Sequence, residues 1–274
     1  MEQTMTSGNS RATGDGSLIY AVCVGRAGTL AHVSGAGFEP DQRIEVLTHG
    51  GLDALFVRLP LGYLVGEDAE SRLADPQWLT PRAMRHEEII RDARAGADVM
   101  PLTLGVVFRE ELSLAEKMRD HAPEILGFLG RVAQRDEWGL KVMLDPGIAL
   151  RSITERLIQA EMQGKAVGPG ARYFLEKKAA SRAGVELRRR EVELAQTIET
   201  FLRETWGEVV VRRATRDESG LSPIGHWALL LDRAQTADLE SLSALVRERA
   251  GEPGLSVVWT GPWAPYSFCP RLAA

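Results

Sequence analysis

The order of strand-like and helix-like segments in the second half of the chain most constrains what this protein can fold into. Apolar, β-branched runs predict four strands, and apolar residues spaced by three, four or seven positions predict two amphipathic helices between them. Strand, helix, strand, strand, helix, strand is the order of a ferredoxin-like βαββαβ fold. A helix over 147–164 is additional to that plan. The strands are expected at 137–144, 207–215, 224–232 and 255–261, and the helices at 171–205 and 236–250.

The first half of the chain predicts a smaller variant of a mixed α/β sheet. An unbroken apolar run over 18–24 is typical of a buried strand, and two strand-like runs around Gly50-Gly51 predict a β-hairpin. Asp75-Pro76 and Thr80-Pro81 are typical helix starts within the helical stretch 65–97. The apolar segment 99–108 follows, interrupted by Pro101 and Gly105, which favour an edge strand, a bulge or a turn.

We therefore predict an α+β protein of two domains. Residues 1–17 are polar and are expected to form a disordered leader. An N-terminal α+β domain is predicted over 18–108. A C-terminal α+β domain with long helices and a tail rich in proline and aromatic residues is predicted over 109–274.

Composition excludes several classes of protein. The 274 residues carry a formal net charge of -5, whereas nucleic-acid-binding domains usually have a basic excess. Cys23 and Cys269 lie at opposite ends of the chain, so neither a disulfide scaffold nor a cysteine-rich zinc site is expected. The chain contains no uncharged apolar run near the ~20 residues that cross a bilayer. These features predict a cytoplasmic protein without membrane or nucleic-acid partners.

The search for catalytic, cofactor-binding and metal-binding motifs finds none that is complete. His86-Glu87-Glu88 begins like a zincin helix, but the second histidine is missing because Ile90 occupies its position; we interpret His86 as a surface histidine. His226 lies in an apolar strand and is interpreted as a core or sheet-face histidine. Neither a Walker A loop nor a GxSxG motif occurs, so we predict no enzyme activity and no cofactor.

Arg188, Arg189 and Arg190 form the densest basic cluster and are the first candidates for partner binding. The helix around them, residues 172–193, carries seven Arg or Lys and four Glu residues. Such a helix is most simply a solvated face with pairs between positions i and i+4. A docking face for an acidic partner is the alternative.

The aromatic tail supplies three more partner-binding candidates, Trp263, Tyr266 and Phe268. They occur in the segment TGPWAPYSF at 260–268, where Gly261 and two prolines restrict the backbone. Three aromatic side chains in so short a segment offer a large apolar area. Such a tail either folds back to close the core, which is the simpler expectation, or presents its aromatic side chains to a partner.

Several segments resemble the gas vesicle GvpL/GvpF proteins. VMPLTLGVVF at 99–108 is similar to that family's PLRFG-T-V-F segment, with Thr103-Leu104 in place of Arg-Phe. GPGARYFLEKK at 168–178 resembles its G-x-(A/S)-Y-L-x-x-K helix start, with Phe174 where Leu or Tyr is common. TGPWAPYSF at 260–268 is similar to TGPWPPYSF, with Ala264 in place of a proline. The resemblance covers about residues 18–268.

This resemblance implies a non-enzymatic accessory or minor structural protein in gas vesicle assembly. Its expected partners are the hydrophobic shell protein and other vesicle accessory proteins, and its expected location is the cytoplasm or the vesicle itself. The family also implies two α+β domains, as the residue pattern does. The residues alone leave two alternatives open, a small-ligand enzyme or an RNA-binding module on a ferredoxin-like sheet.

Overall fold

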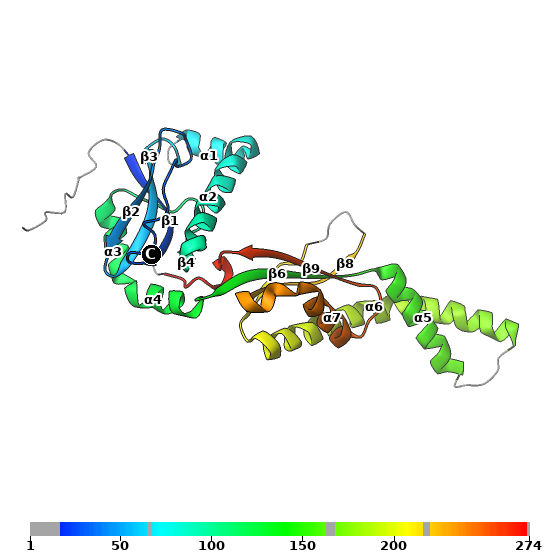
Figure 1. Ribbon diagram of the computed structural model, residues 1–274. Helices are drawn as coiled ribbons and strands as arrows, with labels where there is room; N and C mark the ends of the chain where they lie inside the picture. Colours follow the sequence, from blue (N-terminus) through cyan, green and yellow to red (C-terminus); the bar gives the residue numbers. More distant parts are fainter. Residues whose placement is uncertain (1–16, 65–66, 163–167, 216–219, 273–274) are drawn as a thin grey trace, which may run out of the picture. The chain divides into compact units, whose positions relative to one another are not determined.

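The computed structural model describes residues 17–64, 67–162, 168–215 and 220–272, and it confirms a mixed α+β fold with antiparallel sheets. The chain divides into two compact units (Figure 1). Unit 1 comprises residues 1–134 together with 264–274, and unit 2 comprises residues 135–263. The predicted leader, apart from Ser17, lies outside the described residues.

This division differs from the predicted boundary between 108 and 109. Residues 109–134 form two helices that contact the first sheet, so they belong to unit 1. Residues 264–274 also belong to unit 1, where Ala264 and Phe268 are buried. The chain therefore leaves unit 1 once, forms unit 2, and returns.

Unit 1 is built on an antiparallel sheet of order β2-β3-β1-β4, in which β5 also pairs with β1. The loop between β2 and β3 is Gly50-Gly51, as predicted, and both glycines have positive φ, which two-residue hairpin turns of type I′ require. β1 has neighbours on both sides and is buried along nearly its whole length. The strands are β1 (Ser17–Arg26), β2 (Ile44–His49), β3 (Leu52–Pro60), β4 (Val99–Pro101) and β5 (Val107–Phe108).

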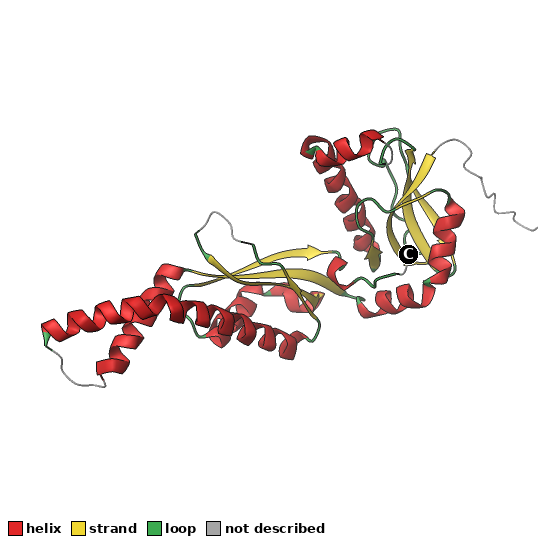
Figure 2. Cartoon of the chain, turned by 180° about the vertical axis from the view of Figure 1, so that it is seen from behind, coloured by secondary structure: helices red, strands yellow, loops and turns green. Residues whose placement is uncertain are grey.

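Helices cover both faces of this sheet (Figures 1 and 2). Tyr20 and Val22 of β1 share a core with Ile89 and Ile90 of one helix, while α3 and α4 contact β1 and α3 also contacts β2. The helices are α1 (Glu67–Ala74), α2 (Pro76–Gly96), α3 (Glu111–Asp120) and α4 (Ala122–Arg131).

The predicted helix start at Asp75-Pro76 is confirmed, and the one at Thr80-Pro81 is wrong. The Asp75 side chain accepts a hydrogen bond from Gln77 N, which makes Asp75 the N-cap, and Pro76 occupies the first helical position, where a proline is tolerated. Pro81 lies inside the same helix.

Unit 2 has a four-stranded antiparallel sheet of order β7-β8-β6-β9. Its core contains alternate residues of β6, such as Trp138, Leu140 and Val142, together with one side of each helix. The strands are β6 (Arg135–Leu144), β7 (Val209–Arg212), β8 (Ser222–Asp232) and β9 (Leu255–Trp263). The helices are α5 (Pro146–Met162), α6 (Pro169–Trp206) and α7 (Leu239–Ala250), and short 3₁₀ turns occur at Arg233–Ala237 and, in unit 1, at Tyr266–Phe268.

Helix α6 is 38 residues long, and its buried residues follow the helical period that the sequence predicted. Leu187, Leu194, Ile198 and Leu202 lie in the core of unit 2. The N-terminal part of α6 and much of α5 extend beyond the sheet as a pair of packed helices (Figures 1 and 2).

We expect Gly225→Ala to destabilise unit 2. A Cβ atom at position 225 would lie 2.1 Å from the ring of Trp227, which is buried two residues further along β8. Moving that ring should lower the free energy of unfolding by about 1–3 kcal/mol. Urea denaturation followed by tryptophan fluorescence measures the change.

Gly184→Ala is the matched control, because a Cβ there meets no atom within 4 Å and the residue lies inside helix α6. This substitution should stabilise the protein by about 0.5–1 kcal/mol. Equal effects of the two substitutions would contradict the packing argument.

Candidate functional site

The titratable residues of the described chain do not assemble a recognisable metal site. The described residues contain no group of three or more His, Cys, Asp or Glu side chains that could hold a metal ion. No helix in the described ranges is long and apolar enough to span a bilayer. Cys23 is fully buried in β1, and burial raises the pKa of its thiol.

His86 is buried inside unit 1, so its interpretation as a surface histidine is wrong. Its Nε2 lies 2.9 Å from the backbone oxygen of Leu102, which can only accept a hydrogen bond. Nε2 therefore carries the proton, and Nδ1 accepts from the Tyr20 hydroxyl at 2.9 Å. The amide of Gly105 donates in turn to the Tyr20 oxygen at 3.3 Å. This chain of hydrogen bonds ties the loop between β4 and β5 to α2 and β1.

The electrostatics of this pair favour neutral side chains. Burial lowers the pKa of His86 below its usual 6.5, against opposing effects of the hydrogen bond to Leu102 and the charge of Glu87. Burial likewise raises the pKa of the Tyr20 hydroxyl. Two neutral groups that satisfy each other fasten the loop in place.

We expect unit 1 to lose stability as the pH falls below about 6.5. The unfolded chain then binds a proton at His86 that the folded protein accepts only at lower pH, so stability is complete above that value and declines below it. Hydrogen exchange of peptides from β1, measured at pH 7.5 and 5.5, should show faster opening at the lower pH.

The control is His86→Gln, in which the amide retains hydrogen-bonding capacity but does not titrate in this range. Its exchange rates, corrected for intrinsic pH dependence, should change less between the two pH values. An unchanged pH response in that variant would exclude His86 as the cause.

His226 lies on β8 of unit 2 and is half-buried, consistent with a histidine on a sheet face. Burial is the main cause of its lowered pKa, and the nearby charges of Arg212 and Lys141 lower it further. Arg212 of β7 pairs with the buried carboxylate of Glu137 on β6, across the intervening strand β8. These residues hold the sheet together across three strands.

Two of the three aromatic candidates in the tail fold back onto unit 1. Phe268 is buried, and its backbone oxygen accepts a hydrogen bond from Arg131 of α4 at 2.6 Å. The Tyr266 hydroxyl donates to Glu87 of α2 at 2.6 Å, and burial raises the pKa of that hydroxyl. Trp263, at the end of β9, is 46% exposed. Of the three, Trp263 therefore offers the most surface to a partner.

The three arginines of the basic cluster have different environments. Arg188 is exposed. Arg189 bonds to Glu186 and Glu193 on the same helix, as a solvated face would. Arg190 lies 3.6 Å from Glu193 on the same helix, and it also donates to Glu252 at 2.8 Å. The Glu252 side chain is fully buried and also accepts from Arg156 of α5 at 3.1 Å.

Arg190 is therefore a structural residue, and we expect Arg190→Ala to destabilise unit 2. The substitution removes one of two charged donors from a buried carboxylate, and hydrogen bonds to charged groups contribute about 1.5–3 kcal/mol. Chemical denaturation should show a loss in that range, and Arg190→Lys should recover part of it.

Arg188→Ala serves as the comparison, because an exposed side chain should change stability by less than about 0.5 kcal/mol. If the Arg188→Ala and Arg190→Ala variants had the same free energy of unfolding, the ion pair between Arg190 and Glu252 would contribute nothing to stability. A charge reversal of all three arginines would mix this structural effect with any loss of binding.

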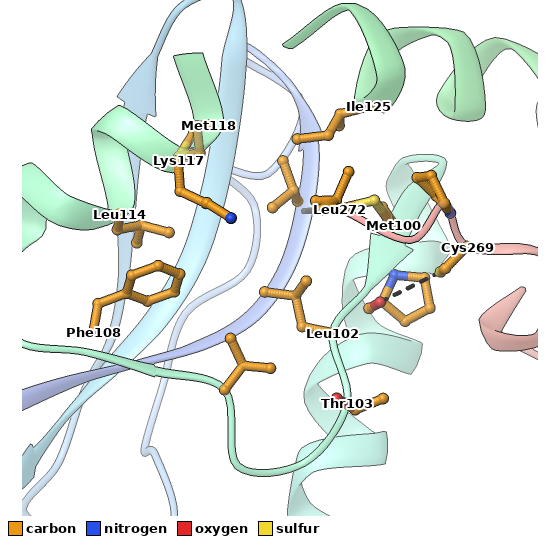
Figure 3. A pocket seen from close by; sticks show the side chains of 14 residues that line it. Met100, Leu102, Thr103, Phe108, Leu114, Lys117, Met118, Ile125, Cys269 and Leu272 are labelled. Atoms are coloured by element: carbon orange, nitrogen blue, oxygen red, sulfur yellow. Dashed lines mark hydrogen bonds between the residues drawn. The ribbon is translucent and has the colours of Figure 1, made fainter. Parts of the chain in front are cut away.

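An apolar cavity of about 330 Å³ lies in unit 1 (Figure 3). Its walls come from the loop between β4 and β5, from α3 and α4, and from the tail after Phe268. Lys117 extends into the space and is the one charged side chain that lines it. The lining residues are Val24, Met100, Pro101, Leu102, Thr103, Val106, Phe108, Leu114, Lys117, Met118, Ile125, Cys269, Pro270 and Leu272.

Sequence reasoning missed this cavity and the role of Glu252. The signal for the cavity was present in the interrupted apolar segment 99–108, whose Pro101 and Gly105 break the strand and leave a loop. Gly105 has φ of 97°, a conformation that favours glycine. Glu252 follows the end of α7 with no motif to mark it.

Comparison with known proteins gives a consistent result. The family model described as gas vesicle synthesis protein GvpL/GvpF matches residues 16–270. Gas vesicle protein L of a Streptomyces species is 30% identical over 254 residues, which cover 91% of each chain. Gas vesicle protein L2 of Halobacterium salinarum is 25% identical and covers 98% of this chain and 97% of its own.

Two crystal structures share the fold. GvpF from an Anabaena species superposes with a TM-score of 0.61 at 16% identity, covering 93% of this chain and 97% of its own. GvpF from Microcystis aeruginosa gives a TM-score of 0.59 at 17% identity, covering 93% and 99%. At these identities the similarity establishes the fold.

Proposed function

The chain belongs to the GvpL/GvpF family of gas vesicle synthesis proteins, which implies a role in gas vesicle formation, and within that role we propose a non-enzymatic accessory or minor structural protein. It binds the hydrophobic shell protein and other vesicle proteins. The observation that carries this proposal is the family match over residues 16–270, which spans both compact units.

The chemistry of a shell subunit explains why such a protein is needed. Apolar chains with open strand edges aggregate before they assemble, unless another protein covers them. A chain with a net charge of -5 that also presents apolar surface can keep such a subunit in solution. The exposed side chain of Trp263 on β9 is the part of unit 2 that we assign to such a surface.

The non-enzymatic part of the proposal is supported by the way polar side chains are used. His86 bonds on both of its ring nitrogens, Glu87 accepts from Tyr266, and Glu252 is neutralised by two arginines. Each of these groups stabilises the fold. We place the protein in the cytoplasm and on the gas vesicle, without a cofactor.

We further infer that unit 2 is a ferredoxin-like domain with one additional helix. Its elements follow the order strand, two helices, strand, strand, helix, strand. The sheet order β7-β8-β6-β9 places the first and third of these strands at the centre, and all three pairings are antiparallel.

Co-purification with the shell protein tests the proposal. We expect the wild-type protein to retain the shell protein when both are expressed in a vesicle-forming host. Trp263→Ala should weaken retention by about tenfold, because exposed tryptophans dominate many binding interfaces. Val258→Ala is the matched control, since Val258 lies on the same strand and is equally exposed at 46%.

Deletion of the gene provides the decisive comparison. Cells that lack it should form few or no vesicles by electron microscopy, and the wild-type gene should restore them. Normal vesicles in the deletion strain, together with no retained vesicle protein, would overturn the proposed function. Equal retention by both β9 variants would remove only Trp263 from the interface.

A further inference from the structure

Helix α6 carries a row of exposed apolar and basic side chains along one face. The apolar members Phe174, Val185 and Val192 are 71%, 64% and 58% exposed. Successive members are three or four positions apart, which keeps them on the same face over about 27 Å of helix. This exposed row consists of Phe174, Lys177, Ser181, Val185, Arg188 and Val192.

The exposed row lies on the side of α6 away from the core. Leu187, Leu194 and Ile198 supply the buried side of the same helix. A surface helix needs only one apolar stripe to pack against its own domain, so α6 has a second one. Single exposed apolar residues are ordinary, whereas apolar side chains aligned on one face mark a surface for another molecule. The N-terminal part of α6 also extends beyond the sheet, where such a molecule can reach it (Figures 1 and 2).

Two aromatic rings form one end of this surface. Tyr173 and Phe174 pack edge to face, with ring centroids 6.1 Å apart and an angle of 73° between the rings. Tyr173 is 62% exposed. Rings that already contact each other lose less freedom on binding, and aromatic side chains contribute most in many interfaces.

Lys177 and Arg188 give the exposed row its charge. Lys177 lies between Phe174 and Ser181 in the row, and Arg188 lies between Val185 and Val192. Neither basic residue forms a salt bridge within the described parts of the chain.

The charge of the surroundings has the same sign. The row contains no acidic residue, and residues 172–193 carry seven Arg or Lys against four Glu, although the whole chain has a net charge of -5. Opposite charges across an interface select and orient the partner. The complementary surface is therefore apolar and acidic.

Two other occupants fit this surface less well. A second copy of this chain would bring a basic row against a basic row, and like charges in contact disfavour pairing. A helix that lies in a membrane surface usually has a broad apolar face with Trp, Phe and Leu. Here apolar and basic residues alternate in a narrow row, and spacing by three and four is the pattern along which two helices pair.

We propose that the exposed row from Phe174 to Val192 binds an amphipathic helix of another gas vesicle protein, whose apolar side chains are spaced by three and four and whose flanking residues are acidic. The inference rests on the proposed function, because it takes the partner from among the vesicle proteins. It adds the binding surface in unit 2 and the chemistry of the bound segment.

Site-specific photo-cross-linking in a vesicle-forming host tests this surface. A photoreactive phenylalanine analogue at position 174 should cross-link to a vesicle protein about tenfold more often than the same analogue at position 112. Leu112 is the matched control, since it is 62% exposed on α3 of unit 1. Mass spectrometry should place the cross-link in a segment with more Asp and Glu than Lys and Arg.

The apolar part of the row is tested by Val192→Glu. It should weaken retention of the cross-linked protein by about tenfold, because it removes apolar contact and brings an acidic group against an acidic partner. Val211→Glu is the matched control, since Val211 of β7 is 57% exposed in the same unit, and it should leave retention unchanged.

The basic part is tested by Arg188→Glu, with Arg249→Glu of α7 as the control on another exposed helix position. Only the first should weaken retention, again by about tenfold. Replacing the facing acidic residue of the cross-linked helix with lysine should restore binding to Arg188→Glu, which a merely destabilised variant would not show. Circular dichroism checks that each variant is folded.

The outcomes separate the inference from the proposed function. Vesicle proteins retained by the wild type, but cross-linked equally from positions 174 and 112, would overturn the exposed row as their site and leave the function intact. Cross-links to a second copy of this chain or to a segment without acidic excess would also overturn it. So would binding to phosphatidylserine vesicles that Arg188→Glu abolishes, with no vesicle protein cross-linked from position 174. A wild type that retains no vesicle protein would overturn both.

Discussion

The chain of hydrogen bonds through Tyr20 and His86 is the interaction on which the rest of unit 1 depends. It links the central strand, the longest helix of that unit and both ends of the loop between β4 and β5. Each donor in this chain of hydrogen bonds has an acceptor. The hydrogen bonds therefore offset the free-energy cost of removing these polar groups from water. Backbone hydrogen bonds from Leu102 N to Val22 O and from Ala21 N to Val106 O hold the same loop against β1.

In unit 2, the corresponding interaction is a buried carboxylate that connects the helices. Glu252 follows helix α7, and Arg156 and Arg190 approach it from α5 and α6. A single fully buried charge thus connects all three helices of the unit. Buried ion pairs of this kind add little net stability, but losing one partner is costly, and this fixes how the helices pack.

Much of the fold could be predicted from the sequence because local patterns determine it. The hairpin at Gly50-Gly51 and the long helix with Leu187, Leu194 and Ile198 follow from turn chemistry and apolar periodicity. The domain boundary could not be placed, because the helical pattern of 109–134 shows an apolar face but not which sheet that face contacts. His86 was misread for a related reason: its neighbours in sequence are charged, whereas its neighbours in space are Tyr20 and Leu102.

The candidate site was predictable only in part. The segments 99–108 and 260–268 carry the family resemblance, yet nothing in the sequence shows that the first of them and the residues after the second line one cavity. The sequence does not distinguish the roles of Arg188, Arg189 and Arg190. Their roles differ because each has a different position on α6, which packs against α5 and α7. Long-range contacts of this kind depend on the topology and leave no periodic signal.

The path of the chain through the two units has a consequence for synthesis on the ribosome. Unit 1 begins with the first strand but needs Ala264 and Phe268 for its core, so it stays incomplete while residues 135–263 are translated. Unit 2 is continuous in sequence and can fold first. The apolar wall around Met100 and Leu102 then remains open in the nascent chain until Cys269 and Pro270 have been translated.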